Sequence, residues 1–410
     1  MNRTTAGRMT PIDEALAQLL QSSRLLVDSE TVPLLTANGR FLAEDIYAAL
    51  DVPGYDNSAM DGFALDSAEL EAGRSTFTIS QRIAAGTMGV DLETGTAARI
   101  FTGAPLPEGA DAVVMQENCH VDGSQLTVLE KVVAGENIRA RGDDIAAGKL
   151  LLTAGRRLGP ADIGLLAAVG QSTVRVRKPL RVALMTTGDE LVKPGTALQP
   201  GQIYNSNFYA LSALLQNLGV TVIDCGCIAD TLAATEQALL SAAQMSDCII
   251  SSGGVSVGEE DHVKTAVETL GALSLWKLAI KPGKPFAFGQ VQGKTFFGLP
   301  GNPVSAFVTF LLMVRPCLLK SMGATKLHGQ EYQLPAGFAL AESGARQEYL
   351  RVSIAVDVNS DQPVLLPFAN QSSGVMTSVS HADGLTIVPP YTAVAVGDML
   401  RYIPFNEIIP

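Results

Sequence analysis

The segment 248–261 combines residue types that suit the binding of a phosphate and a metal ion. It begins with the apolar residues of a buried strand, continues through Ser252, Gly253 and Gly254, and ends with three carboxylates at positions 259–261. Glycines leave backbone N–H groups open to an oxyanion, and Mg²⁺ is usually held by one or two carboxylates together with substrate phosphates. A glycine-rich loop alone is more often a plain turn between a strand and a helix. The interpretation as a site therefore depends on the rest of the chain.

A second group of candidates consists of three lysines within eight residues, Lys277, Lys281 and Lys284. They alternate with apolar residues in a segment that contains prolines and a glycine, so this segment cannot be helical throughout. A preorganised loop that presents several ammonium groups suits an oxyanion or a phosphate. The alternative is that these lysines are solvated surface residues, as most lysines are.

Residues 300–305, Pro-Gly-Asn-Pro-Val-Ser, form a third candidate directly after the expected strand 295–299. Asn302 is a suitable N-cap, and Pro303 is a suitable first residue of a helix. The start of a helix favours an anion because its backbone N–H groups are unpaired. We therefore expect a second loop that faces an anionic ligand.

Composition restricts the class of protein. The chain has 410 residues, 47% of them hydrophobic and 17% charged, which is typical of a globular enzyme with several domains. A net charge of −12 without a basic tail argues against a nucleic-acid partner. The longest apolar run, 306–314, is too short to span a bilayer, and no apolar signal core follows Met1, so we expect no membrane partner. Five cysteines without a Cys-x-x-Cys pair predict reduced thiols and a cytoplasmic location.

The elements that must position these candidates alternate between strand and helix. The apolar pattern predicts buried strands and the helices between them, in the order 181–185, 205–218, 220–225, 233–245 and 248–250. Such alternation predicts right-handed crossovers and a doubly wound α/β sheet. The ligand crevice of such a sheet lies at the carboxyl ends of its strands. We therefore expect Glu190, Asp230 and the Gly253 loop at one edge.

The rest of the chain predicts three further regions. Helix signals occur near the N-terminus, around 35–46 and at 158–169. Short strands separated by turn residues are predicted in two places, in the segment between these helices and at the end of the chain. The expected fold is thus a multidomain α/β protein. Its expected parts are a discontinuous helical scaffold, a β-rich insertion, a doubly wound α/β domain and a small C-terminal β domain, at residues 1–50 with 146–178, 51–145, 179–325 and 326–410.

Six motifs, in this order, resemble the molybdopterin molybdotransferase (MoeA) family, which includes the C-terminal domain of gephyrin. Their sequences are DNSAMDGF, TGAP, TGDEL, SGGVSVG, KPGKP and LPGNP, at residues 56–63, 102–105, 187–191, 252–258, 281–285 and 299–303. A single motif of this length has little weight. Six in register, spread along essentially the whole chain, are highly specific.

The resemblance implies a function and an assembly. Members of the family take adenylated molybdopterin, place molybdate on its dithiolene sulfurs and release AMP in a Mg²⁺-dependent step. They are elongated homodimers, in which the sheet domain of one subunit and the β-rich domain of the other form the cleft. The implied partners are other proteins of molybdenum cofactor biosynthesis, namely the pterin adenylyltransferase and the downstream acceptors of the cofactor.

The resemblance also assigns roles to residues of this chain. The implied catalytic residues are Asp61, Thr102, Glu190, Asp230, Asp261, Lys277 and Lys281. Among them, Asp261, Asp230 and Glu190 are the implied metal ligands, because carboxylates alone would repel a substrate phosphate. Glu190 and Asp61 are also expected near the pterin, and Lys277 and Lys281 near molybdate and phosphate. The implied substrate-binding residues are Arg139, Asp144, Thr187, Gly188, Asp189, Ser252, Gly253, Gly254, Val255, Ser256, Lys284, Pro300, Gly301, Asn302, Pro303, Arg351 and Ser373.

The chain departs from the family pattern at several positions. Thr231 follows Asp230 where the family often has a second acid, and Ala140 stands where an arginine is common. The loop around Ser373 lacks the flanking histidine that is frequent there, and His262 replaces a common tyrosine.

Other functions stay open at this point. A molybdopterin adenylyltransferase has a related sheet domain but consists mainly of that domain. A non-catalytic dimeric scaffold or delivery protein would bind the pterin or a partner peptide, and a generic sugar or nucleotide enzyme would share only the fold. The retained acids and lysines favour the molybdotransferase.

Overall fold

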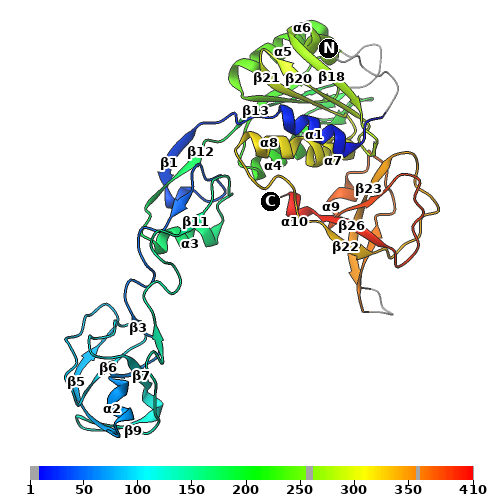
Figure 1. The fold of residues 1–410 in the computed structure, drawn as a ribbon. Coiled ribbons are helices and arrows are strands. Elements are labelled where there is room, and N and C mark those ends of the chain that lie inside the picture. The colour runs from blue at the N-terminus through cyan, green and yellow to red at the C-terminus, as the bar shows by residue number, and fades with distance from the viewer. Residues whose placement is uncertain (1–8, 255–261, 357–360, 410) are drawn as a thin grey trace.

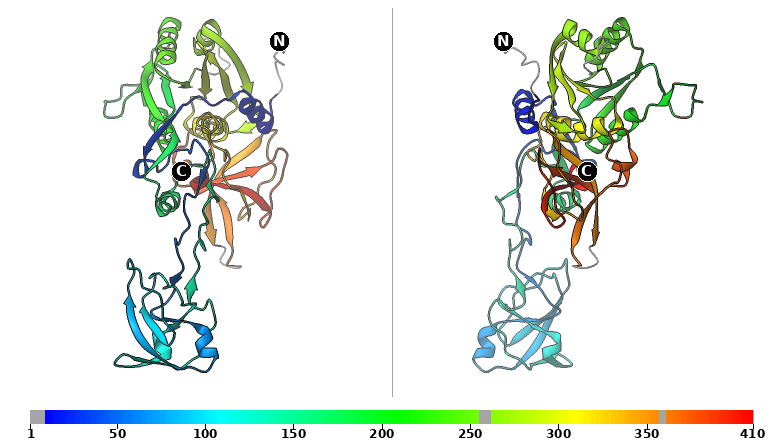
Figure 2. Two further views of the ribbon diagram at one scale, coloured as in Figure 1. Left: turned by 60° about the vertical axis from the view of Figure 1, so that its left-hand side comes forward. Right: turned by 90° about the vertical axis from the view of Figure 1, so that its right-hand side faces the viewer.

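The computed structural model describes residues 9–254, 262–356 and 361–409. An α/β domain lies at one end of the molecule with a C-terminal β domain beside it, and a β-rich insertion lies at the other end (Figure 1). Two adjacent stretches of chain join the insertion to the small region between the two ends, so the molecule is elongated in every view (Figure 2). The exact domain boundaries expected from the sequence remain predictions.

The α/β domain is built on a mixed sheet. Its strands, in their order across the sheet, are β16 (Thr221–Ile228), β13 (Arg181–Thr187), β17 (Cys248–Ser252), β21 (Lys294–Leu299), β20 (Pro285–Val291) and β18 (Gly271–Lys277). The first four strands run parallel, while β20 and β18 form an antiparallel hairpin at the edge, which the sequence did not predict. Strands β13 and β17 are buried almost throughout, as central strands covered on both faces are.

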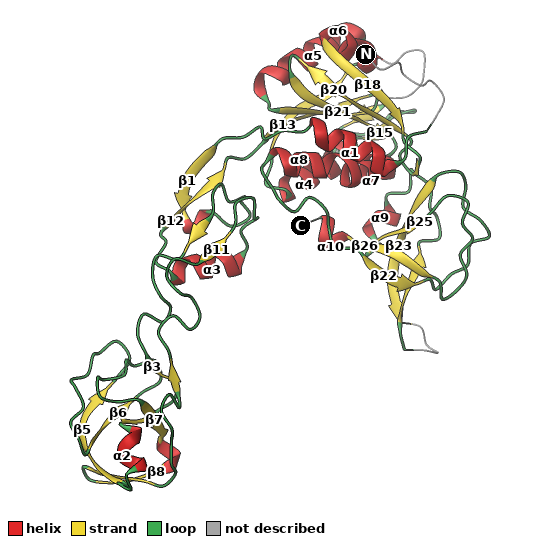
Figure 3. Cartoon of the chain, viewed as in Figure 1, coloured by secondary structure: helices red, strands yellow, loops and turns green. Residues whose placement is uncertain are grey.

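Helices cover both faces of this sheet, which confirms the doubly wound architecture (Figure 3). Alternate residues of β13 point to opposite cores, because side chains alternate along a strand: Val182 and Leu184 face one, Ala183 and Met185 the other. The first core includes residues of α1 (Ile12–Ser22), α4 (Ser206–Asn217), α7 (Pro303–Thr309) and α8 (Arg315–Ser321). The second includes residues of α5 (Leu232–Met245) and α6 (His262–Leu270).

The helix from Pro303 to Ser321 is long and apolar enough to cross a membrane by length and composition, but 89% of its apolar window is buried inside the protein. A π-helical turn, Phe310–Val314, joins its two α-helical parts. Its side chains fill the first core of the α/β domain. It is therefore a core helix of this domain.

The region between the two ends contains two small antiparallel sheets and, within its described residues, one α-helix. These elements are β1 (Ser29–Pro33) with β12 (Thr173–Arg177), β2 (Ile46–Tyr47) with β11 (Leu150–Leu152), and α3 (Pro160–Ala168). The predicted helix at α3 is confirmed. This region is less helical than the sequence predicted, because α1 packs against α8 of the α/β domain instead.

The helix expected around residues 35–46 is wrong. The chain forms only a short 3-10 turn, Leu34–Thr36, and then an irregular path to β2. Gly39 has a φ of 80°, a left-handed conformation that ends any helix at this point. Leu35, the first residue of the expected helix, is 89% exposed.

The β-rich insertion is a sheet of short strands with one helix packed on it. In their order across the sheet, the strands are β7 (Ala112–Met115), β4 (Gly62–Leu65), β6 (Thr96–Ile100), β5 (Thr76–Ile83), β9 (Gln125–Val128) and β8 (Cys119–Asp122), and the helix is α2 (Ser67–Glu71). A short pair, β3 (Asn57–Ser58) with β10 (Ile138–Arg139), closes the insertion where it meets the connecting segments. The predicted strands at residues 77–79, 98–100, 112–115 and 126–128 are confirmed.

The C-terminal domain is a β-sheet that includes one strand of the α/β domain. Across the sheet the strands are β19 (Ile280–Lys281), β23 (Gln347–Val356), β25 (Gly384–Val388), β26 (Met399–Pro404) and β22 (Tyr332–Pro335), with β24 (Pro363–Pro367) paired to β23. Two short helices, α9 (Thr377–Ser380) and α10 (Phe405–Ile408), complete it. Because β19 comes from the lysine-bearing segment, this pairing fixes the two domains to each other.

Replacing Leu184 by alanine is expected to lower the free energy of unfolding of the α/β domain by about 2–5 kcal/mol, because the removed atoms leave a cavity in a fully buried core. Leu35→Ala is the matched control, and its 89% exposed side chain predicts a change below about 0.5 kcal/mol. Urea unfolding followed by the fluorescence of Trp276, the one tryptophan of the chain, measures both. Equal losses in the two variants would contradict the assigned core.

Candidate functional site

A cavity of about 920 Å³ lies where β13, β17 and β21 end. Its walls include many of the residues predicted from the sequence: Thr187, Gly188, Glu190, Asp230, Ser252, Gly253, Gly254, Pro300, Gly301, Asn302 and Pro303. The expectation that Glu190, Asp230 and the Gly253 loop meet at one edge of the sheet is thereby confirmed. Parallel strands produce this meeting because their carboxyl ends share an edge.

The floor of the cavity depends on a close approach between two strand ends. Gly253 has a φ of 98°, and a Cβ atom there would lie 2.8 Å from both the carbonyl oxygen and the hydroxyl of Thr187. Its N–H donates to the carbonyl of Leu299 at 3.1 Å, which connects β17 to β21. Only glycine fits this position without displacing β13.

Asn207, which the sequence analysis did not select, joins three parts of the cavity wall. Its Nδ2 donates to the Ser252 hydroxyl at 2.9 Å and to the Gly301 carbonyl at 2.7 Å. The hydroxyl of Ser252 in turn donates to the carbonyl of Pro300 at 3.2 Å. The polar run Asn205-Ser206-Asn207 at the start of α4 was a signal for this role, since it stands at the same edge as the other candidates.

The described carboxylates of the cavity are Glu190 and Asp230. The backbone N–H of Asp230 donates to Oδ1 of Asp189 at 3.1 Å, so the two loops that carry these acids are in contact. Within residues 9–254, 262–356 and 361–409, no three His, Cys, Asp or Glu side chains form a group that could hold a metal by itself. The predicted Val255, Ser256 and Asp261 lie outside the described residues.

The three lysines lie on a hairpin that leaves the sheet and returns to it. Lys277 ends β18, Lys281 is in β19, and Lys284 precedes β20. All three are exposed, and none is part of the wall of the described cavity, although the adjacent Pro285 is. The roles of these lysines at the site remain predictions, and the sequence did not reveal their strand pairing.

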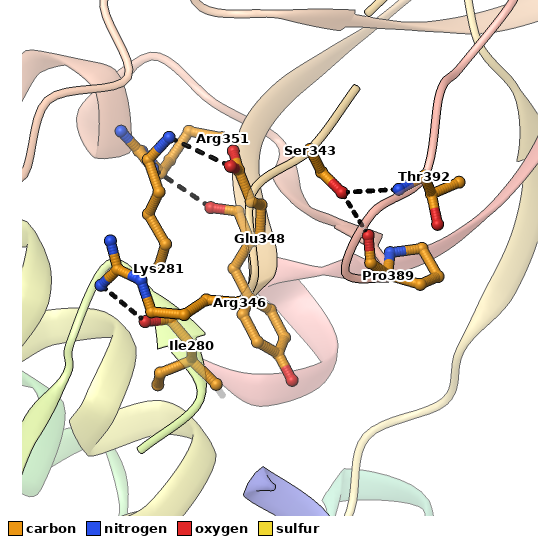
Figure 4. A network of polar contacts seen from close by, with 9 residues as sticks. Ile280, Lys281, Ser343, Arg346, Glu348, Arg351, Pro389 and Thr392 are labelled. Carbon is orange, nitrogen blue, oxygen red and sulfur yellow. Dashed lines mark hydrogen bonds and ion pairs between the residues drawn. The ribbon is translucent and has the colours of Figure 1, made fainter. Parts of the chain in front are cut away.

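Lys281 already has a carboxylate partner in the C-terminal domain. Its Nζ lies 3.1 Å from Oε1 of Glu348, whose side chain is only 10% exposed (Figure 4). The parallel pairing of β19 with β23 places these two residues opposite each other. Glu348 was not predicted, because its contact with Lys281 joins residues 67 positions apart in the chain.

Arg351 is buried beside this ion pair (Figure 4). Its guanidinium donates to the hydroxyl of Ser378 and the carbonyl of Tyr349, both at 3.1 Å, and to the carbonyl of Ser372 at 3.5 Å. Burial lowers the pKa of Arg351 to about 10, while the negative charge of Glu348 acts in the opposite direction. The side chain therefore stays cationic at neutral pH, and a substrate contact for it remains a prediction.

The carbonyl of Ser373 accepts the backbone N–H of Val304 at 2.9 Å. This bond connects the loop after β24 to the first turn of α7, next to Pro303 in the cavity wall. Asn302 is the N-cap residue as predicted, but its side chain makes no capping hydrogen bond. The backbone of Ser373 thus supports the start of α7 beside the cavity, and its role as a substrate contact remains a prediction.

A second group of predicted residues lies on the insertion. The insertion is at the opposite end of the molecule from the α/β domain, which holds the cavity (Figure 1). Oδ1 of Asp61 accepts both the N–H and the hydroxyl of Thr102 at 2.8 Å. These two hydrogen bonds are the main reason why the pKa of Asp61 is lowered. Arg139 is exposed on β10, and Asp144 lies exposed where the insertion meets its connecting segments. One chain alone does not bring this group and the cavity together.

The fold and the cavity define a multidomain α/β protein with a ligand site at the carboxyl edge of its sheet, and comparison with known families narrows this class. Residues 10–170 match the MoeA N-terminal region (domain I and II), 183–320 the probable molybdopterin binding domain, and 333–405 the MoeA C-terminal region (domain IV). The chain belongs to the MoeA family.

Curated relatives and a solved structure are similar to this chain over most of its length. The molybdopterin molybdenumtransferase of Haemophilus influenzae is 41% identical over 317 residues, which cover 77% of this chain and 78% of that protein. The enzyme of the same name from Nostoc is 36% identical, and the alignment covers 88% of this chain and 85% of that protein. The crystal structure of the MoeA protein from Pyrococcus horikoshii covers 97% of this chain and 100% of that chain, with a TM-score of 0.83 at 27% identity.

The Thr102→Val variant is expected to raise the pKa of Asp61 towards its usual value. The hydroxyl bond that favours the carboxylate is lost, whereas the stronger backbone N–H bond remains, so the pKa stays below the usual value. A pH titration of the side-chain carboxyl resonances by NMR measures the shift. Asp51, whose pKa is lowered mainly by the N–H of Ala147, serves as the internal control. An unchanged Asp61 titration would contradict the assigned contact.

Proposed function

We propose that this chain is a molybdopterin molybdenumtransferase, which transfers molybdate to the dithiolene of adenylated molybdopterin and releases AMP in molybdenum cofactor biosynthesis. The observation that carries this proposal is the cavity at the sheet edge, because its walls include residues from four of the six motifs that resemble the MoeA family. Relatives with this activity in their names align over most of the chain. We expect a cytoplasmic enzyme with no nucleic acid or membrane partner.

The cavity suits a nucleotide-like substrate. Its volume of about 920 Å³ lies within the range of small-molecule sites, roughly 300–1,000 Å³. Gly253 and Gly254 line the cavity without side chains, which lets a phosphate approach their backbone, and Asn207 holds the surrounding wall in place. The lysine hairpin beside Pro285 supplies positive charge for the phosphate and for molybdate. Salt screens charges beyond about 8 Å, so these lysines outweigh the diffuse negative charge of the protein.

The described acids of the cavity fit a magnesium ion. Mg²⁺ is usually held by one or two carboxylates, several waters and substrate phosphates, and Glu190 and Asp230 offer the two carboxylates. We propose Glu190, Asp230 and the predicted Asp261 as the residues that hold it. When bound, the ion would neutralise charge between these carboxylates and the phosphates of the substrate.

The separation of Asp61 and Thr102 from the cavity supports a site shared between two subunits. In one chain the insertion and the α/β domain lie at opposite ends (Figure 2). We propose a homodimer in which the insertion of one subunit, with Asp61, Thr102 and Arg139, completes the cavity of the other. The proposed partners of this dimer are the pterin adenylyltransferase, which supplies its substrate, and the downstream acceptors of the cofactor.

The purified protein is expected to release AMP from adenylated molybdopterin only when molybdate and Mg²⁺ are both present. Chromatography measures AMP, and metal analysis measures molybdenum retained on the pterin. Lys281→Ala should reduce the rate by at least about tenfold, because the variant lacks a cation proposed to bind the oxyanion. Tight pterin binding without AMP release would instead indicate a scaffold or delivery protein, and consumption of ATP with release of pyrophosphate would indicate an adenylyltransferase.

Mixing two variants of strongly reduced activity, Asp61→Asn and Asp230→Asn, is expected to restore activity. If each site takes Asp61 from one subunit and Asp230 from the other, a mixed dimer contains one intact site. Random pairing then gives roughly a quarter of the wild-type rate. The variants are mixed under mild dissociating conditions and then reassociated, and each variant treated alone is the control. No recovery in samples shown to contain mixed dimers would contradict the shared site.

A further inference from the structure

Arg99 of the insertion is stacked between two aromatic rings. Its guanidinium carbon lies 5.1 Å from the ring centre of Phe63 and 4.7 Å from that of Phe101. Distances within about 6 Å allow a favourable cation–π contact. Phe63 lies two residues after Asp61, and Phe101 directly precedes Thr102. The stack therefore connects the two segments that carry the Asp61–Thr102 pair.

Hydrogen bonds from the same guanidinium restrain the backbone around Asp61. Nη1 of Arg99 donates to the carbonyl of Gly62 at 2.9 Å, and Nη2 donates to Oε1 of Gln116 at 2.5 Å. The backbone N–H of Gln116 donates to the carbonyl of Asp61 at 3.1 Å. Arg99 thus restrains the carbonyl of Gly62 directly and the carbonyl of Asp61 indirectly, through Gln116.

In the described part of the chain, the guanidinium of Arg99 donates to Gly62 and Gln116 and forms no ion pair with the carboxylate of Asp61. Oδ1 of Asp61 instead accepts the two hydrogen bonds from Thr102. The positive charge of Arg99 contributes to the lowered pKa of Asp61, after the larger effect of the Thr102 hydrogen bonds. The groove beside the stack, about 530 Å³ in volume and lined by Phe63, Arg82, Arg99 and Gln116, leaves the guanidinium partly open to solvent.

We propose that Arg99 is a positioning residue that fixes the relative placement of Asp61 and Thr102 for the reaction. This role rests on the proposed function, in which Asp61 and Thr102 complete the cavity of the partner subunit. Arg99 acts through the planar shape of its guanidinium, which stacks between two rings while donating to two acceptors. A lysine has one compact ammonium group and cannot reproduce this geometry.

Arg82 provides a matched control on the same surface. Its guanidinium lies 4.4 Å from the ring centre of Phe101, so it stacks on one of the two rings. Within the described chain, its side chain makes no hydrogen bond or ion pair with the backbone around Asp61 or Thr102. Arg82→Ala thus removes a similar charge and a similar stacking contact but leaves the restraint on Asp61.

The activities of variants at Arg99 and Arg82 test the proposal. Arg99→Ala and Arg99→Lys are expected to lower kcat by about 10- to 100-fold, because small misplacements of reacting groups have effects of this size. Arg82→Ala is expected to stay within about threefold of wild type. In an Asp61→Ala background, Arg99→Ala should add less than about threefold, because the two residues act as one unit. Equal losses for Arg82→Ala and Arg99→Ala, or fully additive losses with Asp61→Ala, would overturn the proposal.

Amide hydrogen exchange tests the same restraint without any turnover. The N–H of Thr102 is bonded to the Asp61 side chain and that of Gln116 to the Asp61 backbone, so both should exchange faster in Arg99→Ala than in Arg82→Ala. Unchanged exchange in Arg99→Ala would refute the positioning role. If the wild-type protein showed no transferase activity, the proposed function would fail, whereas the exchange result would still decide whether Arg99 holds Asp61 in place.

Discussion

The site depends on the contact between Gly253 and Thr187 at the carboxyl ends of two neighbouring strands. A Cβ atom at Gly253 would lie 2.8 Å from two oxygens of Thr187, so any other residue would separate β17 from β13. The same glycine donates to Leu299 at the end of β21. Three strand ends are therefore held together, and the loops that leave them enclose one cavity. The core on each face of the sheet fixes the strands behind this contact.

Sequence patterns predicted the parts of the molecule that follow from local chemistry. The buried strands β13 and β17, the helices between them and the shared sheet edge could be predicted because continuous apolar runs and strand–helix alternation leave few topologies. The location of Glu190, Asp230 and the Gly253 loop in one cavity followed from that topology. Their roles towards substrate and metal stay predictions.

Other features could not be predicted because they arise from contacts between distant segments. The pairing of β19 with β23 and the ion pair of Lys281 with Glu348 join residues that only the tertiary fold brings together. The segment 35–46 has helical apolar spacing, yet the left-handed Gly39 and the exposed Leu35 show that local spacing was overridden by the path of the chain. The role of Arg99 was not predicted because its partners lie in other segments of the insertion. Gly62 is in β4, and Gln116 directly follows β7.

The shared strand β19 makes the C-terminal domain inseparable from the lysine hairpin. A gene fragment that ends after α8 would encode the whole doubly wound sheet, but its lysine hairpin would lack the backbone partner that β23 provides. Unpaired strand edges attract other strands, so such a fragment would be prone to self-association. We therefore expect the two domains to fold as one unit, so that a chain break at residue 326 disturbs the lysine hairpin.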